Sequence, residues 1–226
     1  MVSGETTDIR TFMIKIQTFA CNMLEENCYV VSDETLSCVI IDCGAFFDKD
    51  RQAITDYIEN KQLKPEHLLV THGHLDHNFG NNMVYQNYGL KPEIEEHDVS
   101  LLNNLPKQAK SFYGMSFEQP SVPIGNILHD GDEVVFGTHR VEVIHTPGHS
   151  RGSVSFYIPD EDTLFTGDTL FQMSIGRTDF EGGSMMQIIQ SLRRLAQLPD
   201  QTAVYPGHGD STTIGFELQH NPYMDR

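Results

Sequence analysis

The sequence predicts a mixed α/β fold in which helices lie outside two β-sheets. Two observations support this prediction. Short β-branched runs recur in the first fifth of the chain and again between residues 133 and 166, and amphipathic helical segments alternate with them. The length of 226 residues suits one domain, which we expect to span residues 11–226 after a flexible leader of residues 1–10.

The elements expected in the first half follow from local patterns. Apolar and polar residues alternate over 12–18, as in a half-buried strand. Two β-branched runs, 28–31 and 38–41, indicate a hairpin. A helix is expected over 50–60, where Ile54, Tyr57 and Ile58 share one face, and a brief buried strand over 68–70. A second helix is expected over 77–88, ended by Gly89.

The middle of the chain, 103–125, contains several prolines and has weak periodicity, so we expect a loop or flap there. Its aromatic residues Phe112, Tyr113 and Phe117 are expected either to pack in the core or to face a substrate. Further strands are expected over 133–136, 140–144, 153–158, 164–166 and 203–205. An apolar stripe over 185–196 predicts a helix that stops at Leu198-Pro199, and a final short helix is expected over 212–219.

The charge balance limits the partners of this protein. The formal net charge is −17, from 15 basic and 32 acidic residues. Binding to a phosphate backbone depends on lysine and arginine, so neither nucleic acid nor an anionic membrane surface is an expected partner. Residues 1–10 are polar, and no apolar run approaches a membrane span, so we expect a cytoplasmic protein. The four cysteines lack C-x-x-C spacing and are expected to be reduced and structural.

Five of the eleven histidines fall in three short segments that share a pattern. These segments are Thr-His-Gly-His-Leu-Asp-His (71–77), Thr-Pro-Gly-His-Ser (146–150) and Pro-Gly-His-Gly (206–209). A fourth segment, Thr-Gly-Asp-Thr (166–169), places an acid in the same setting. Each follows an apolar run and carries a glycine, which indicates the end of a strand where the backbone turns tightly. Imidazole and carboxylate groups at converging strand ends suit a divalent metal ion.

The number of donors suggests two ions rather than one. One ion at four- to five-fold coordination cannot use all of them, whereas two ions that share a bridging carboxylate can. The candidate ligands are His72, His74, Asp76, His77, His149, Asp168 and His208. We expect His145 to pack in the core or support a ligand. The remaining histidines are expected to be surface or hydrogen-bonded residues, namely His67, His97, His129, His139 and His220.

This set of motifs resembles the metallo-β-lactamase superfamily, whose signature is H-x-H-x-D-H. The resemblance extends from Phe12 to His220 and includes Ile-Asp-Cys-Gly at 41–44. It implies a four-layer αββα sandwich of two mixed sheets flanked by helices. It also implies that His72, His74 and His149 hold one ion, that Asp76, His77 and His208 hold the other, and that Asp168 bridges them. Asp42 matches a position that supports the ligands without touching the metal.

Within the superfamily the sequence is most similar to glyoxalase II, the hydroxyacylglutathione hydrolases. Arg177, in Gly-Arg-Thr-Asp-Phe, matches a basic residue that holds a substrate carboxylate in that group. Two departures leave the thiol carrier open: Asp179 stands where an aromatic residue is expected, and a longer helical carboxyl-terminal region is missing.

The resemblance implies hydrolysis of a small thioester by a hydroxide held between two metal ions, expected to be zinc, with iron or manganese also compatible with these ligands. Asp76 and His77 are the expected catalytic ligands, and Asp76 would also orient the hydroxide. A thiolate leaves without an acid catalyst, because thiol pKa values lie near ~8.5.

Three alternatives remain open. A persulfide dioxygenase of the same superfamily shares Gly-Arg-Thr-Asp-Phe and would use a single iron on His72 or His74 with His149 and Asp168. A lactonase or other ester hydrolase would use the same two-metal set. A metal-binding sensor or scaffold would have no turnover. The complete second set of ligands favours hydrolysis.

Overall fold

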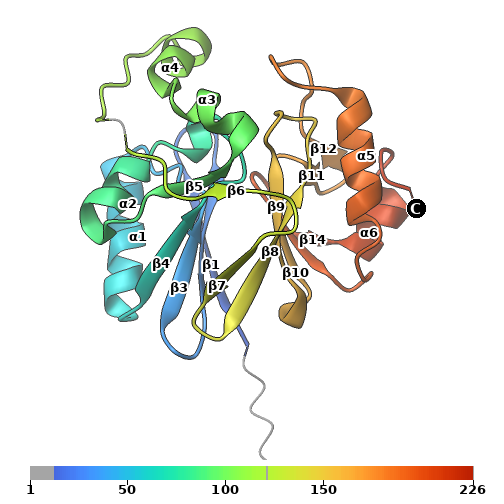
Figure 1. Cartoon of the computed structure of the whole chain (residues 1–226), viewed down its shortest axis with the longest axis horizontal. Helices are drawn as coiled ribbons and strands as arrows, with labels where there is room; N and C mark the ends of the chain where they lie inside the picture. The colour runs from blue at the N-terminus through green and yellow to red at the C-terminus, as the bar shows by residue number, and fades with distance from the viewer. Residues whose placement is uncertain (1–12, 121, 226) are drawn as a thin grey trace, which may run out of the picture.

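Two six-stranded sheets packed face to face form the centre of the computed structural model, which describes residues 13–120 and 122–225 (Figure 1). The strand order is β1-β2-β3-β4-β5-β6 in the first sheet and β14-β13-β10-β9-β8-β7 in the second. The predicted leader, residues 1–10, and the start of the predicted strand at 12–18 lie outside the described residues.

The first sheet begins as an antiparallel meander and continues in parallel. Helices α1 (Asp48–Asn60) and α2 (Asn81–Tyr88) make the crossovers on either side of β4, as parallel neighbours require. Its strands are β1 (Lys15–Cys21), β2 (Glu26–Ser32), β3 (Ser37–Ile41), β4 (Lys64–Leu69), β5 (Pro92–Glu95) and β6 (Ile127–Leu128).

The second sheet is mainly antiparallel, and β10 pairs in parallel with β13 through the crossover helix α5 (Met185–Leu195). Ser184 caps α5 by accepting a hydrogen bond from the amide of Gln187. The strands are β7 (Glu133–Phe136), β8 (His139–His145), β9 (Val154–Ile158), β10 (Thr163–Gly167), β13 (Ala203–Pro206) and β14 (Thr212–Thr213), with β11 (Leu170–Phe171) and β12 (Ser174–Ile175) forming a separate hairpin.

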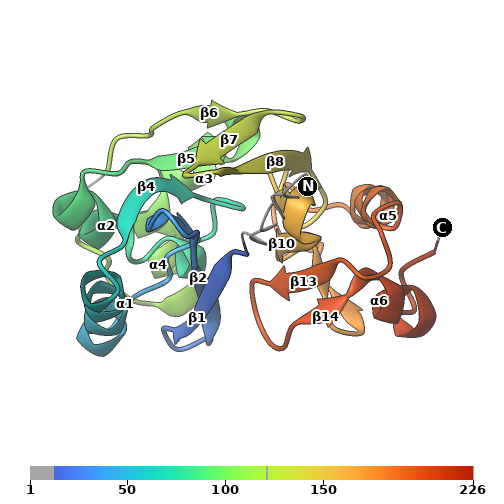
Figure 2. The ribbon, with the colours of Figure 1, turned by 90° about the horizontal axis from the view of Figure 1, so that it is seen from below.

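Three apolar layers hold this arrangement together. Val31 and Ile41 of the first sheet pack against Phe156 and Phe165 of the second. The outer face of the first sheet packs on α1 and α2, and the outer face of the second packs on α5 and α6 (Ile214–His220), as Figure 2 shows from below. The predicted αββα sandwich is therefore confirmed.

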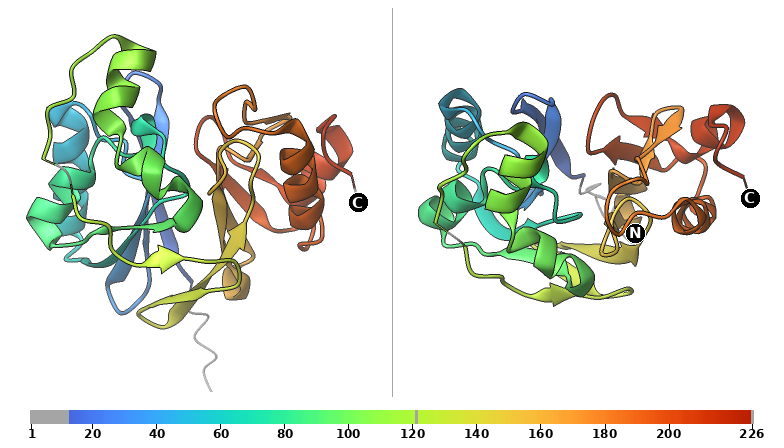
Figure 3. Two further views of the ribbon diagram at one scale, coloured as in Figure 1. Left: turned by 45° about the horizontal axis from the view of Figure 1, so that its top comes forward. Right: turned by 90° about the horizontal axis from the view of Figure 1, so that it is seen from above.

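The loop predicted over 103–125 is wrong in its first half, where helix α4 (Leu105–Tyr113) forms after the short α3 (Val99–Leu102). Pro106 was interpreted as a sign of a loop, but it lies in the first turn of α4, where proline is tolerated. Gly114 ends the helix in a left-handed conformation with a φ of 63°. Both helices lie at the upper end of the first sheet in Figure 1 and in the turned views of Figure 3.

The helix predicted over 77–88 begins later, at Asn81. Before it, Leu75–His77 forms a single 3-10 turn, because the metal-ligand candidates in this segment are turned inward rather than along a helix face. Strands β5, β6, β11, β12 and β14 were not predicted, because two to four residues are too few to show alternation. Across the described residues, no helix combines the length and apolar character needed to cross a membrane.

Candidate metal centre

Four predicted donors lie on one loop beyond strand β4. The strand ends at Leu69, and the chain then turns over the end of the sheet into the 3-10 turn. All four donor side chains are buried, although histidine and aspartate are usually exposed. They are His72, His74, Asp76 and His77. Burial of so many polar groups on one loop indicates that they contact each other or bind a common ligand.

The other three donors come from the second sheet, each just after a strand. His149 follows β8, Asp168 follows β10, and His208 follows β13. His149 is 2% exposed, and 25% of the His208 side chain is exposed. The structure therefore brings together all seven donors from four loops at the junction of the two sheets.

The donor atoms form overlapping groups, and two of these groups match the two predicted metal sites. The first contains His72, His74 and His149, and the second contains Asp76, His77 and His208; within each group the donor atoms lie within 4.8 Å of one another. In the first group His74 Nδ1 is 2.8 Å from His149 Nε2.

Asp168 faces both groups. Its Oδ1 lies 3.3 Å from His77 Nε2 and 3.8 Å from His208 Nε2. Its Oδ2 lies 3.5 Å from His149 Nε2. The two oxygens of one carboxylate thus point in the two directions that a bridging ligand requires.

Unpaired buried atoms show what these residues fit. His72 Nε2, His77 Nε2 and Asp168 Oδ1 are buried and have no hydrogen-bond partner in the described structure. An unsatisfied buried polar atom costs about 1–3 kcal/mol, so three of them converging on one place need a ligand. Imidazole nitrogen and carboxylate oxygen are donors for zinc and neighbouring transition metals. The chemistry of these donors therefore fits divalent metal.

Hydrogen bonds behind the histidines fix which ring nitrogen faces the centre. His77 Nδ1 lies 2.9 Å from Asp42 Oδ2, the residue that the resemblance gave a supporting role. Backbone carbonyls accept from two further rings: that of Arg177 is 2.8 Å from His149 Nδ1, and that of Leu24 is 3.1 Å from His208 Nδ1. Such partners orient these three imidazoles so that Nε2 is the nitrogen left to face the donor groups.

Burial and neighbouring charges shift the pKa values of the donor residues in different directions. Burial, reinforced by neighbouring histidines, lowers the pKa of His72 well below its ordinary value and that of His74 to about 4. Burial alone would raise the pKa of Asp168, but the adjacent His77 outweighs it and holds that pKa well below its usual range. Burial alone would lower the pKa values of His77 and His208, but nearby carboxylates, Asp168 for His77 and Asp76 for His208, raise them, to well above the ordinary value for His77. These two rings must release a proton to bind metal, because neutral imidazoles and ionised carboxylates are the forms that bind it.

Sequence reasoning missed Asp98, which joins two of the ligand loops. Its carboxylate, fully buried, accepts hydrogen bonds from the Gly73 amide at 2.9 Å, the Gly152 amide at 2.8 Å and the Ser150 hydroxyl at 2.6 Å. Gly73 lies between two histidine donors, and Ser150 follows His149. No local pattern marks Asp98, because its three partners come from distant parts of the chain.

Three further supporting residues were also missed. Gln108 of α4 accepts from the Leu75 amide and donates to the Gly73 carbonyl. Glu26 accepts from the Gly44 amide beside the ligand loop, and burial raises its pKa well above the ordinary value.

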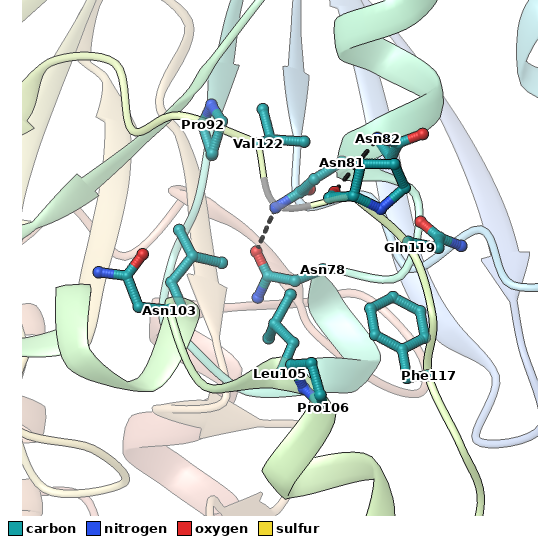
Figure 4. Close-up of a pocket in the computed structure, with 12 residues that line it drawn as sticks. Asn78, Asn81, Asn82, Pro92, Asn103, Leu105, Pro106, Phe117, Gln119 and Val122 are labelled. Atoms are coloured by element: carbon teal, nitrogen blue, oxygen red, sulfur yellow. Dashed lines mark hydrogen bonds between the residues drawn. The ribbon is translucent and has the colours of Figure 1, made fainter.

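The third of them, Asn78, donates to the carbonyls of His72 and His74 at 3.1 and 2.6 Å. Figure 4 shows Asn81 donating to Asn78 at the wall of a small cavity behind the loop. Its position directly after the His-x-His-x-Asp-His motif was the one available sequence signal for Asn78.

A cavity of about 490 Å³ opens onto the donor groups. Its outer wall is formed by α4 and by the loop between β12 and α5, through Phe112, Tyr113, Arg177 and Phe180. Phe117 instead packs in the core beside Phe79. A volume in this range suits a small organic molecule.

Comparison with known proteins places the chain in a family. The profile of the metallo-beta-lactamase superfamily matches residues 22–208, so the chain belongs to this superfamily. It is 33% identical to the hydroxyacylglutathione hydrolase GloC of Haemophilus influenzae over 216 residues, which cover 94% of this chain and 99% of that protein. The chain is thus a member of a superfamily of metal-dependent hydrolases.

Solved structures show the same architecture. The BLEG-1 B3 metallo-beta-lactamase superposes with a TM-score of 0.86 at 32% identity, covering 93% of this chain and 99% of that one. TTHA1623 in a di-iron-bound form superposes with a TM-score of 0.81 at 32% identity, covering 92% and 100%. The resemblance predicted from the motifs is therefore confirmed at the level of family and fold.

Proposed function

We propose that this protein is a dinuclear metal hydrolase of small thioesters, of the hydroxyacyl-thioester type. The observation that carries the proposal is the pair of donor groups joined by Asp168. His72, His74 and His149 would hold the first ion, and Asp76, His77 and His208 the second. Zinc is the expected metal, and iron or manganese would suit the same donors.

Two divalent ions bound here would supply a hydroxide nucleophile at neutral pH and would polarise a carbonyl oxygen. The protein's own residues do the rest. Asp76, with Oδ2 3.4 Å from His208 Nε2, presents its carboxylate to the cavity and would orient the attacking oxygen. Phe112 and Phe180 form an apolar wall that would hold the substrate over the donors.

The cavity lining also fits a thiolate leaving group. Outside the metal-ligand set, its described lining carries no carboxylic acid that could donate a proton. An alkoxide or amine leaving group needs such a donor more than a thiolate does, because thiols ionise near ~8.5. The similarity to a hydroxyacylglutathione hydrolase supports the same choice of substrate class.

The competing functions differ in the number of metal ions, the substrate or the turnover that they require. A persulfide dioxygenase would need one ion, and here the second donor group of Asp76, His77 and His208 is assembled as fully as the first. A lactonase would use the same centre on an ester. A scaffold would bind metal without turnover.

Thiol release from S-lactoylglutathione and from a neutral lactoyl thioester, by protein loaded with zinc, iron or manganese, tests the proposal. We expect hydrolysis with two ions bound and none in the double variant His72→Ala, His74→Ala. Parallel assays measure the hydrolysis of lactone and β-lactam substrates and the uptake of oxygen with glutathione persulfide. Oxygen uptake without thiol release, or thiol release that survives in the double variant, would overturn the proposal.

A further inference from the structure

A further group of metal-binding side chains lies outside the centre described above. Glu95, His97 and His145 each offer one donor atom, and these three atoms lie within 4.8 Å of one another. Glu95 ends strand β5 and His97 lies in the 3-10 turn that follows it, whereas His145 ends strand β8. The group therefore brings together a strand end of the first sheet and a strand end of the second.

The carboxylate of Glu95 is the buried member of this group, at 4% exposure. Its Oε1 lies 2.8 Å from His97 Nδ1, and its Oε2 accepts a hydrogen bond from the His97 amide at 2.7 Å. The side chain of His97 is 53% exposed. The His145 ring stacks on that of His97 with 6.1 Å between centroids, and its Nε2 lies 2.9 Å from the Arg151 carbonyl oxygen. One buried carboxylate and two imidazoles thus converge on a place that an ion can reach from solvent.

The charges around the group favour a cation. The hydrogen bond and the charge of Glu95 raise the pKa of His97, and Glu96 and Asp98 act in the same direction. On the other strand, Asp130 accepts from the His145 amide at 2.8 Å and is itself paired with Arg194. The field that favours a proton on His97 also attracts a divalent cation, which displaces that proton when it binds.

The donor types indicate which cation the group would take. Two imidazoles and a carboxylate suit zinc and neighbouring transition metals, whereas calcium and magnesium take oxygen ligands. Zinc lies about 2.0–2.1 Å from an imidazole nitrogen, so donors on opposite sides of it are about 4.2 Å apart at most. Donor atoms within 4.8 Å of one another therefore need a small movement to close on the ion, and the exposed ring of His97 is free to rotate.

We propose that Glu95, His97 and His145 form a separate surface site for one zinc ion or a similar divalent transition metal ion. The ion ties the turn after β5 to the end of β8. His145 lies four residues before His149, and His97 directly precedes Asp98, which holds the Gly73 amide and the Ser150 hydroxyl. The bound ion would therefore stabilise the loops that position the buried centre, whatever substrate that centre acts on.

Zinc titration of the desalted protein tests the proposal. An open site with three donors exchanges its ion with solvent more readily than the buried centre does, so desalting empties it and leaves the buried ions in place. Isothermal titration calorimetry should then show one further zinc ion per chain and no binding of calcium. His97→Gln and His145→Gln should each weaken this binding by at least about ten-fold, because even the loss of a hydrogen-bond partner of a metal ligand costs that much.

The matched control is His220→Gln. His220 is also exposed, but it lies on α6 and contacts the Phe216 carbonyl through Nδ1 at 2.9 Å, so zinc should bind to this variant as it does to the wild type. The midpoint of thermal unfolding gives a second measurement. Added zinc should raise it in the wild type and in His220→Gln, and should leave it unchanged in His97→Gln and His145→Gln, because a ligand stabilises only the fold that binds it.

Three results would overturn the inference. The wild type could bind no further zinc ion, or it could bind one that His97→Gln and His145→Gln bind equally well, which would place the ion elsewhere. An equal loss of binding in His220→Gln would show that exposed histidines bind zinc in general. Elemental analysis of the desalted variants separates this test from the proposed function, because both should retain the buried ions of the wild type.

Discussion

The substitution Asp98→Asn tests how the centre is held together. Asp98 is fully buried and accepts three hydrogen bonds, two from loop amides and one from the Ser150 hydroxyl. Asparagine has the same shape, but its amide nitrogen donates and cannot accept, so at least one of these donors loses its partner. The remaining hydrogen bonds also become weaker, because their acceptor is no longer charged.

The expected cost follows from these contacts. A lost bond with a buried unsatisfied donor costs about 1–3 kcal/mol, and bonds to a charged group are worth about 1.5–3 kcal/mol against about 1 for neutral ones. Together these give a destabilisation of about 3 kcal/mol for the metal-free protein. Because Gly73 and Ser150 adjoin ligands, we also expect metal affinity to fall by roughly 10–100-fold, as when partners of metal ligands are removed elsewhere.

Urea unfolding of the metal-free protein and metal titration against a competing chelator measure the two effects. Asp225→Asn, which removes an exposed carboxylate, is the matched control and should change stability by less than about 0.5 kcal/mol. A loss below about 1 kcal/mol in Asp98→Asn with unchanged metal affinity would refute the view that this carboxylate joins the ligand loops.

Three further predictions concern a tightly packed glycine, a histidine–carboxylate pair and the bound metal. Gly148 has a φ of +138°, and an added methyl group would collide with the backbone of Ile188, so Gly148→Ala should lower the free energy of unfolding by more than about 2 kcal/mol. The control Gly131→Ala also has a positive φ but its added methyl group meets no atom, so its loss should be smaller by at least about 1 kcal/mol. Equal losses in the two variants would contradict the predicted collision. The hydrogen bond to Glu93 raises the pKa of His67, so this pair stabilises the fold fully below the ordinary histidine pKa and loses that stabilisation as pH rises through the raised pKa. His67→Gln should therefore lower the free energy of unfolding more at pH 6 than at pH 9. An equal loss at the two pH values would contradict this pairing. Removal of the metal with a chelator should lower the midpoint of unfolding, since a ligand at about 1,000 times its Kd adds about 4 kcal/mol of stability per site. A midpoint that a chelator does not change would show that these donors bind no metal.

The local part of this site could be predicted from the sequence. His72, His74, Asp76 and His77 occupy one short segment, and each remaining donor sits beside a glycine at the end of an apolar run. Such signals are local because a strand end and its turn are encoded by adjacent residues. The stripe of α5 was predictable for the same reason, with Ile188 and Leu192 in the core.

What could not be predicted depends on tertiary contacts. Asp98 and Gln108 serve the ligand loops from separate elements, and nothing near them in sequence marks that role. Strand β6 has two residues and exists because β5 offers it an edge. The pairing of Arg177 with Asp179 depends on side-chain orientation, which the motif Gly-Arg-Thr-Asp-Phe does not reveal.

The proposed function depends on the assembly of a two-ion centre bridged by Asp168. Elemental analysis of the purified, desalted wild type and of His208→Ala is the decisive test of this centre. We expect about two ions per chain in the wild type and about one in His208→Ala, because His208 belongs to the second donor group alone. One ion or fewer in the fully loaded wild type, or two retained in His208→Ala, would contradict a two-ion centre built on these donors.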